Sequence, residues 1–498
     1  MINNSIWETQ KYPNNFPALN NDIKTDFLII GAGITGLSVA YELLSCSSNI
    51  TIVDTNEIYQ NTTSSTTAKI TYQHGFIYHD LITKHGIEKA TQYYLFNNQG
   101  MKRIGEVVER ENIQCDYQKV NGYLYCLNEQ EKLNLEFEAY QKIGITATQA
   151  KINPKITPYP ALKVTDQANF NIASYLKAIT NILLQNNVQI YEHTRIVDVN
   201  HKKHPYALTS NHHYIQANNI IICSHYPVYR SFNFFFTKLI PQISYSVLAS
   251  QATDIENANY INVENETIAL RFIKDEVDWY LNISGSTHDA NKFTHTFDEI
   301  NKLKAFGEKH FGIKEYQYTW CAQDYCSTDY IPYVGRIKDN IFLATGYNEW
   351  GMAAASAASL LIKDLIKKNY SDFQELCNPL RIKINQKLIT YNSKMLVTFF
   401  KTRIMIKKKI RKLTPNTGMV IKKGHKRLGI YMNDSYQITI VNATCPHLHC
   451  GLHFNPLEKT YDCRCHGSRF AYNGKLIDGP SHHDLKLLNF SELDDFHL

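Results

Sequence analysis

Apolar and polar positions over residues 26–54 are spaced as in a β-α-β unit. A short apolar run at residues 26–30 predicts a strand, and a helical pattern follows it through Leu44. A second apolar run at residues 49–54 predicts the next strand. Two strands joined by a helix in this way are typical of a parallel sheet.

The rest of the chain continues with helical and strand patterns until the pattern changes after Pro379. We expect helices over residues 80–110, 174–187 and 352–367, and strands over 220–223, 241–250, 266–287 (with a turn near 274–276) and 340–346. After Pro379 the chain becomes rich in Lys and Asn and loses clear periodicity, so we place a linker at residues 381–414. Short strands separated by Gly, Pro and Asn predict a small all-β domain over residues 415–498.

The turn after the first predicted strand has the pattern Gly31-x-Gly33-x-x-Gly36 and leads into a helix. In a dinucleotide-binding unit Gly31 permits the tight turn, Gly33 lets the backbone approach a pyrophosphate, and Gly36 lets the helix pack closely. Asp54 ends the next strand and is expected to accept hydrogen bonds from a ribose. The pattern does not separate FAD from NAD, but it occurs once in the chain, which favours FAD reduced directly by an organic substrate.

A second constellation, Cys445-x-His447, then fifteen residues, then Cys463-x-x-His466, lies in the C-terminal part. Two thiolates on one iron and two imidazoles on the other are the ligands of a Rieske [2Fe–2S] centre. Zinc also accepts two Cys and two His, and it is the competing interpretation. The tight Cys-x-His spacing and the His-Gly-Ser-x-Phe sequence ending at Phe470 favour the Rieske centre.

Charge adds one feature to this picture. The chain has a formal net charge of +6, and residues 401–427 contain eleven Lys or Arg and no Asp or Glu. We expect a solvated linker there, with an acidic partner or an anionic membrane surface as alternatives. No aromatic residues are interleaved as base-stacking requires, so no nucleic-acid partner is expected. Without a signal-peptide pattern or an apolar run of about 18 residues, we expect a cytoplasmic protein with no transmembrane segment.

The first ~375 residues resemble the D-amino-acid oxidase/dehydrogenase superfamily of FAD enzymes. The resembling segments are residues 64–69, 195–197, 220–224, 329–336 and 344–352, with Cys223-Ser224 as a departure from the family pattern. The resemblance implies an α/β Rossmann-type FAD-binding domain with an interleaved antiparallel-sheet substrate domain. Besides the glycines and Asp54, it implies FAD contacts from Thr67, Ala68, Lys69, Val197, Gly346, Trp350, Gly351 and Met352. A helix N-terminus at residues 351–352 would stabilise negative charge on reduced flavin.

Substrate residues are implied by the same resemblance. Relatives often hold a substrate carboxylate with an Arg on the antiparallel sheet, and Arg271 is the candidate here. Lys69 and His74 are expected to line the substrate side of the flavin. No Cys lies within residues 345–352, so non-covalent FAD is expected, with His74 as the alternative attachment point.

The C-terminal part resembles the Rieske proteins of cytochrome bc-type complexes. That resemblance implies a disulfide between Cys450 and Cys465, two free thiols being the alternative in a reducing compartment, and a covering loop at Gly479-Pro480. The whole chain resembles bacterial FAD-dependent oxidoreductases with a C-terminal Rieske domain, giving domains at 1–380 and 415–498.

Together these resemblances imply an enzyme that takes electrons from a small amine or amino-acid-like substrate through FAD. A Rieske cluster then passes them singly to an unidentified external acceptor. The alternative is a redox sensor or assembly protein without turnover. A Rieske oxygenase is set aside, because the FAD fold occupies the region where its iron domain would lie.

Overall fold

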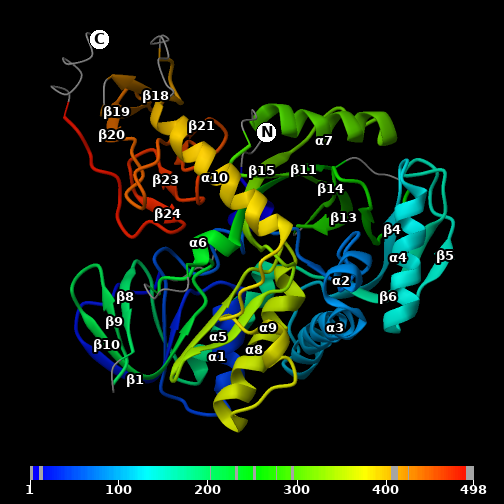
Figure 1. Cartoon of the computed structure of the whole chain (residues 1–498), viewed down its shortest axis with the longest axis horizontal. Coiled ribbons are helices and arrows are strands. Elements are labelled where there is room, and N and C mark those ends of the chain that lie inside the picture. Colours follow the sequence, from blue (N-terminus) through cyan, green and yellow to red (C-terminus); the bar gives the residue numbers. More distant parts are fainter. Residues whose placement is uncertain are drawn as a thin grey trace.

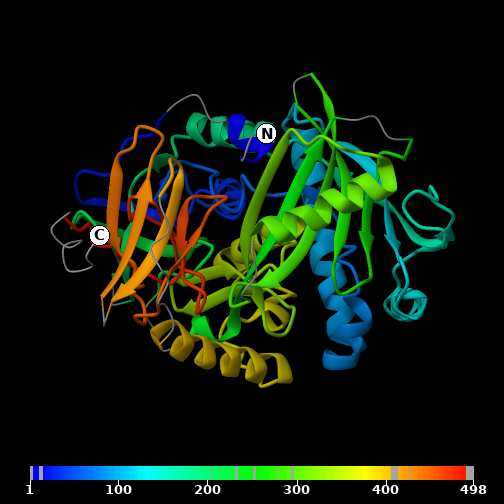
Figure 2. The same cartoon turned by 90° about the horizontal axis from the view of Figure 1, so that it is seen from above.

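A computed structural model gives the fold of the chain. It describes all residues except 1–3, 11–14, 202–203, 230–233, 251–253, 276, 293–295, 405–412, 424–425 and 490–498. Part of the predicted turn at 274–276 and part of the basic run at 401–427 therefore lie outside the described residues. Figures 1 and 2 show a sheet layer with its helices, a second sheet beside it, and a small β domain formed by the C-terminal strands.

The first sheet has a parallel centre. Its strands are β1 (Ile23–Ile30), β2 (Ile50–Val53), β7 (Gln189–Tyr191), β8 (Ile196–Asn200), β9 (Tyr206–Thr209), β10 (Tyr214–Ile222), β16 (Tyr333–Lys338) and β17 (Ile341–Thr345). Their order is β16-β17-β10-β1-β2-β7, and β9 and β8 continue antiparallel from β10. The pairs β1–β10, β1–β2, β10–β17 and β2–β7 are parallel.

Both faces of this sheet are buried. Phe27 and Ile29 belong to one apolar cluster, whereas Leu28 and Ile30 belong to another. Successive side chains of a strand point to opposite faces, so a continuous apolar run in the sequence corresponds to a strand covered on both sides.

Helices cover the first of these clusters. They are α1 (Ile34–Leu43), α2 (Tyr78–His85), α3 (Ile87–Arg110), α4 (Gln130–Ile143), α5 (Ile172–Gln185), α8 (Gly351–Lys368) and α9 (Gln374–Cys377). Helix α1 packs against α5 and α8, and α8 packs against α3. The helix expected over residues 80–110 is two helices, because Gly86 between them has a φ of +86°.

The second sheet carries the interleaved domain. Its strands are β3 (Lys69–Ile70), β4 (Gln118–Tyr125), β5 (Thr148–Ala150), β6 (Ala161–Asn169), β11 (Leu239–Ala249), β12 (Asn259–Asn262), β13 (Ile268–Lys274), β14 (Trp279–Asp289) and β15 (Tyr318–Ser327). Their order is β15-β11-β14-β13-β12-β4-β6-β3, mainly antiparallel, and helix α7 (Thr296–Phe311) packs on β11 and β14. Its segments come from both sides of β10 in the sequence, as expected for an interleaved domain.

The C-terminal domain contains two small antiparallel sheets. One consists of β18 (Thr417–Lys423), β19 (Lys426–Met432) and β20 (Ile438–Asn442), and the other of β21 (His453–Asn455), β22 (Thr460–Asp462), β23 (Arg469–Ala471) and β24 (Leu476–Asp478). The loops between these strands carry the Cys and His residues that the sequence analysis singled out.

The segment expected to be a linker without periodic structure contains helix α10 (Gln386–Ile404). Tyr391, Met395 and Phe399 recur every four residues and face inward, the last two against the apolar core of the C-terminal domain. Apolar residues occur on both faces of this helix, Met395 and Phe399 inward and Leu396 and Phe400 outward, so its sequence shows no single apolar side. No helix of the described residues is long and apolar enough to cross a bilayer.

A buried ion pair fixes the chain just before α10. Arg381 donates to both carboxylate oxygens of Asp329, at 2.8 and 2.9 Å, and its guanidinium lies 4.0 Å from the ring centroid of Tyr333. Burial favours the protonated form of Asp329, but the hydrogen bonds from Arg381 outweigh it and hold the pKa of Asp329 below its usual value. The pair therefore stays charged and ties the end of the FAD-type domain to the following helix.

Candidate active site and metal centre

The glycine turn between β1 and α1 lies against β10 with no room for side chains. A Cβ on Gly31, whose φ is +109°, would lie 2.5 Å from the carbonyl oxygen of Cys223. A Cβ on Gly36 would lie 1.8 Å from the carbonyl oxygen of Gly31. Both contacts are with backbone atoms that cannot move aside, so the turn requires glycine at these positions. The N-terminus of α1 is thereby left open to a cavity that Gly31 and Gly33 line.

Asp54 follows β2 and also faces this cavity. Its two carboxylate oxygens accept hydrogen bonds from the backbone N–H of Ala32, at 2.7 Å, and of Asn56, at 2.8 Å. Burial raises the pKa of Asp54 to about 6. The carboxylate holds the glycine turn in place and has lone pairs left for a ribose hydroxyl.

The cavity extends from Asp54 past the glycine turn to the N-terminus of α8, where Gly346, Trp350, Gly351 and Met352 line it. No side chain caps the first turn of α8, so its backbone N–H groups are free to face a ligand. Two helix N-termini meeting one elongated cavity fit the pyrophosphate and the pyrimidine end of FAD. The residues present therefore fit the expected flavin.

Several other predicted cofactor residues lie near this cavity with different roles. Thr67 and Lys69 line it, whereas Gly36 and Ala68 lie behind its wall. Arg195 and Ile196 line it, but the predicted Val197 does not. Val197 lies where the pairing of β8 with β9 is irregular, between Ile196 and Asp198.

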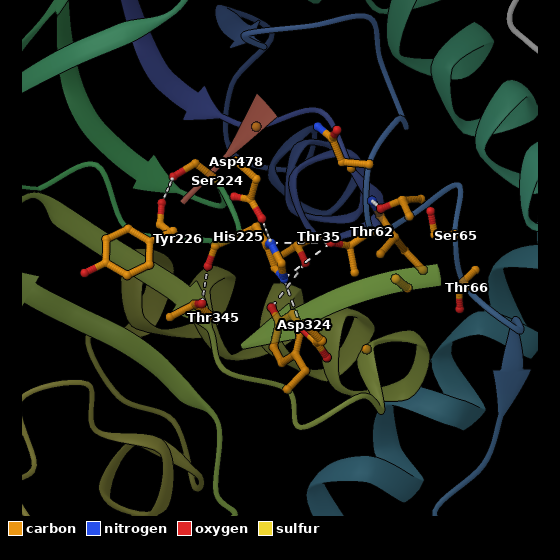
Figure 3. Close-up of a pocket in the computed structure, with 18 of the residues that line it drawn as sticks. Thr35, Thr62, Ser65, Thr66, Ser224, His225, Tyr226, Asp324, Thr345 and Asp478 are labelled. Atoms are coloured by element: carbon orange, nitrogen blue, oxygen red, sulfur yellow. Dashed lines mark hydrogen bonds and ion pairs between the residues drawn. The ribbon is translucent and has the colours of Figure 1, made fainter. Parts of the chain in front are cut away.

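The C-terminal domain forms part of the wall of the same cavity. Leu476, Ile477, Asp478, Gly479, Ser481 and His482 belong to its lining. Figure 3 shows Asp478, from β24, directed at His225, which is also directed at Asp324 on β15. A flavin bound in this cavity would therefore lie next to the domain that carries the predicted metal ligands.

His225 bridges the two domains through carboxylates on both sides. Its Nδ1 lies 2.8 Å from Asp478 and its Nε2 lies 3.0 Å from Asp324. Burial lowers the pKa of His225, but the charges and hydrogen bonds of the two carboxylates outweigh it and raise the pKa to about 10. Both ring nitrogens therefore carry protons at neutral pH, and the ring is a cation shared by two anions.

Two ionisable groups on the cavity wall have pKa values near neutral. Lys69 is buried, and burial followed by the charge of Arg271 lowers its pKa to about 7. The Glu349 side chain is accessible from the open cavity, but protein surrounds the cavity on most sides. Desolvation by that protein, followed by the charge of Asp324, raises the pKa of Glu349 to about 7. The Glu349 side chain accepts a hydrogen bond from Thr287 at 3.3 Å. Groups of this kind are suited to proton transfer.

The structure places His74 and Arg271 outside the walls of this cavity. His74 is buried between Tyr93 and Thr71, with its ring stacked on Trp350 at 4.4 Å, and burial lowers its pKa to about 3. Its nitrogens bond protein groups, so the geometry does not present them for covalent attachment.

Arg271 holds the loop before Lys69 through hydrogen bonds to backbone carbonyl groups. Its guanidinium donates to the carbonyl oxygens of Thr67 and Ala68, both at 2.6 Å, and to that of Phe272 at 2.9 Å. These bonds hold the loop that precedes Lys69. With its donors directed at backbone carbonyls, Arg271 is oriented toward the cofactor loop rather than toward a substrate carboxylate.

The four predicted metal ligands converge in the core of the C-terminal domain. Cys445 and Cys463 are buried and adjacent, and the rings of His447 and His466 lie 4.9 Å apart. Nδ1 of His447 and both ring nitrogens of His466 are buried without a hydrogen-bond partner. Unpartnered buried imidazole nitrogens beside paired thiols are what a [2Fe–2S] cluster with two Cys and two His ligands would satisfy. The hydroxyl of Ser468 also bonds Cys445, as expected for a donor that tunes cluster sulfur.

Cys450 and Cys465 lie beside the ligands as free thiols, and the expected disulfide is not formed in the structure. The sulfur atoms of Cys450, Cys463 and Cys465 all lie within 4.8 Å of one another. The two side chains are thus already neighbours across the two ligand loops, and the bridge between them stays a prediction.

Sequence reasoning missed Glu349, His225, Asp324 and Asp478. Glu349 lies in the segment 344–352 that resembles the family's flavin loop, and an acidic residue just before the N-terminus of the following helix was the available signal. The other three come from segments far apart in the chain, and no spacing along the sequence connects them.

Two family models match the chain, one for each part. The model described as FAD dependent oxidoreductase matches residues 26–365, and the model described as Rieske [2Fe-2S] domain matches residues 404–489. YhfW of Bacillus subtilis (strain 168), whose name refers to a Rieske 2Fe-2S iron-sulfur protein, is 31% identical over 501 residues. That alignment covers 97% of each chain, so the likeness includes both parts.

Solved structures resemble the first part in fold. Glycine oxidase from Geobacillus kaustophilus matches with a TM-score of 0.59 at 14% identity, covering 73% of this chain and 100% of that one. L-proline dehydrogenase from P. horikoshii matches with a TM-score of 0.58 at 14% identity, covering 72% and 98%. At these identities the likeness shows the fold alone.

Replacing Cys463 by Ser should remove the cluster and leave the flavin in place. We expect the EPR signal of the reduced cluster to disappear and the iron content to fall to background, because one iron loses a thiolate ligand. The flavin absorbance per chain should be unchanged. Cys46→Ser is the matched control, since Cys46 is exposed and outside both sites. Zinc instead of iron in the purified wild type would contradict the assignment.

The contribution of His225 to stability should depend on pH. Its pKa is higher in the folded chain than in the unfolded one, so the stabilisation is fully present below pH 6.5 and is lost as the pH rises toward about 10. We therefore expect His225→Gln to lower the thermal midpoint by several degrees at pH 6 and by much less at pH 9.5. A difference between wild type and variant that stays constant over this range would refute the ion-pair bridge.

Proposed function

The chain belongs to the family of FAD-dependent oxidoreductases and carries a C-terminal Rieske domain, and on that premise we propose that it oxidises a small amine or amino acid. The electrons leave through the Rieske centre to an external acceptor. The two family matches show an FAD-dependent oxidoreductase with a Rieske [2Fe–2S] domain. The substrate class and the direction of electron flow are the proposal.

The observation that carries this proposal is the shared cavity. Residues 476–482 of the Rieske domain line the cavity into which the flavin-binding turn opens. Tyr325, on β15 of the FAD domain, has its hydroxyl 3.4 Å from the carbonyl oxygens of His466 and Gly467, and Gln323 donates to Gly467 at 2.8 Å. The cluster ligand loop therefore packs on β15, the strand that also supplies Ala322 and Asp324 to the cavity lining, and this supports electron transfer from flavin to cluster.

Side chains of the cavity lining can supply the proton transfer that substrate oxidation needs. Bound FAD accepts two electrons as a hydride, and the cluster passes electrons one at a time. With pKa values near 7, Lys69 and Glu349 can each hold or release a proton at the cavity wall. An amine must lose a proton before its C–H bond can give up a hydride, and a neutral Lys69 or an ionised Glu349 is placed to accept it. Arg271 holds the loop before Lys69 in place.

An amine or amino acid is supported by the fold and by this wall together. The chain has the fold of glycine oxidase and L-proline dehydrogenase, whose names refer to amino-acid substrates. Where Glu349 is the proton acceptor, a protonated Lys69 and an ionised Glu349 on the cavity lining match a small zwitterion in charge. The second candidate, a redox sensor without turnover, would use the same two centres but would need no proton acceptor at the flavin.

An anaerobic titration with small amines and amino acids tests the proposal. We expect at least one compound to bleach the flavin absorbance and then to produce the EPR signal of the reduced cluster. In Cys463→Ser the same compound should still bleach the flavin, because substrate oxidation precedes cluster reduction. Bleaching by dithionite alone, with none of the amines or amino acids active, would favour the sensor.

Proton transfer at the cavity wall gives a second expectation. Glu349→Gln and Lys69→Met should each leave flavin content unchanged and lower the rate of flavin reduction by about 10²-fold or more if that residue is the acceptor. The wild-type rate should change with an apparent pKa near 7, and the responsible variant should lose that dependence. Glu315→Gln, at an exposed position, is the control. Unchanged rates in both variants would remove these residues from the mechanism.

A further inference from the structure

Helix α10 carries large apolar side chains on its outward face, with Gln386 and Ser393 as the polar exceptions, although the helix lies at the surface of the molecule. Ile389, Leu396, Val397 and Phe400 are each between 50% and 54% exposed. Their spacing of seven, eight and eleven residues places them on one stripe of the helix. Figure 2 shows this gold helix along the lower edge of the molecule, with no other element of the described chain beyond it. A stripe of four large apolar side chains on an outer helix needs a partner.

Cationic residues border this stripe. Lys394 and Lys401, seven residues apart and both exposed, lie along one side of it. Such an arrangement lets the aliphatic stems of Lys and Arg cover apolar surface while their charged groups reach outward. An apolar stripe with exposed Lys side chains along its edge is the pattern of a helix that lies in a membrane interface.

The charge of the surrounding sequence has the same sign. Residues 376–427 contain no Asp or Glu, and residues 381–427 contain fifteen Lys or Arg. The whole chain has 52 Lys or Arg against 46 Asp or Glu, so the remainder has 37 against 46 and is acidic. The positive charge is therefore concentrated in the part of the sequence that contains and follows α10. An anionic surface would attract this region and repel the rest of the chain, which would orient the molecule.

The segment before α10 adds further exposed apolar side chains. Leu380, Ile382 and Ile384 are 46%, 79% and 76% exposed. They alternate with Arg381, which is paired with Asp329, and with Lys383, which donates to the carbonyl oxygen of Lys84 at 2.7 Å. The cationic side chains of this segment thus point inward and its apolar side chains point outward, the reverse of what is usual for a segment at a protein surface.

We propose that the outer face of α10 docks the protein on an anionic phospholipid bilayer, lying in the interface without crossing it. A second copy of the chain fits this face less well, because two copies would bring their cationic borders together. Nucleic acid would bind the cationic side chains but would leave the apolar stripe exposed to water.

Docking at this face has a consequence for the cluster. Tyr391 of α10 donates to the carbonyl oxygen of Cys465 at 3.1 Å, and Arg403 donates to that of Leu448 at 3.3 Å. The helix therefore contacts both ligand loops of the Rieske domain. Binding to a bilayer would bring the iron–sulfur centre close to the membrane surface, where a lipid-dissolved electron acceptor would be within reach.

Vesicle co-sedimentation of the full-length holoprotein tests the proposal. We expect binding to vesicles of phosphatidylcholine with 30% phosphatidylglycerol, and much weaker binding to phosphatidylcholine alone. Lys394→Gln with Lys401→Gln should lower the partition coefficient about five-fold for each charge removed. Phe400→Ser should also lower it, because an apolar group is lost from the interface. Raising the salt concentration should weaken binding of the wild type.

Matched controls lie on other helices. Phe297→Ser on α7 changes a side chain that is 50% exposed, and Lys142→Gln with Lys368→Gln removes two exposed charges from α4 and α8. These variants should bind as the wild type does. As a local readout, the fluorescence of Leu396→Trp should shift to the blue on anionic vesicles and be quenched by brominated lipid.

Three results would overturn the proposal. One is a wild type that binds neither vesicle. Another is binding that the α10 variants and the control variants weaken equally. The third is a dimer in solution that Phe400→Ser dissociates, since a second copy would then cover the stripe. None of these readouts depends on turnover, so failure of docking and failure of the proposed oxidation are separately visible.

Discussion

The arrangement of this protein depends on one constraint: the Rieske domain must close the cavity into which the flavin-binding turn opens. The imidazolium of His225 meets that constraint by bonding Asp324 on the antiparallel sheet and Asp478 on the Rieske domain at once. Arg195 adds a second link, donating to Asp484 at 2.7 Å. The imidazolium hydrogen-bonds both carboxylates only when the two domains lie in one relative position. The interaction therefore gives the domains a defined orientation.

The flavin end of the cavity is organised by backbone rather than by side chains. Gly31 and Gly36 permit contacts that no Cβ allows, and two helix N-termini are thereby directed at the same space. Side chains then determine what happens beside the flavin. The surrounding protein penalises the charged forms of Lys69 and Glu349 and moves both pKa values to about 7, while the Arg271 guanidinium bonds the loop that carries Lys69.

Helix α10 connects the two functions of the Rieske domain. Its inward face, with Tyr391, Met395 and Phe399, supports the cluster loops, and its outward face carries the apolar stripe. The same short helix therefore holds the exit point for electrons and, in our proposal, places it at a surface. The segment that joins the two domains is therefore an ordered helix that packs on the Rieske domain.

The sequence by itself determined the two centres. Gly31, Gly33 and Gly36 in a β-α-β context, and Cys445, His447, Cys463 and His466 at fixed spacing, are local patterns, because each is made by a turn or a pair of loops whose geometry depends on near neighbours. The family matches confirm the FAD and [2Fe–2S] cofactors that these patterns predicted. Only the tertiary structure decided that the domains share one cavity, that Arg271 faces backbone carbonyls, and that residues 386–404 form a two-faced helix. Those features depend on contacts between distant segments, such as His225 with Asp478, and no periodicity along the chain encodes such contacts.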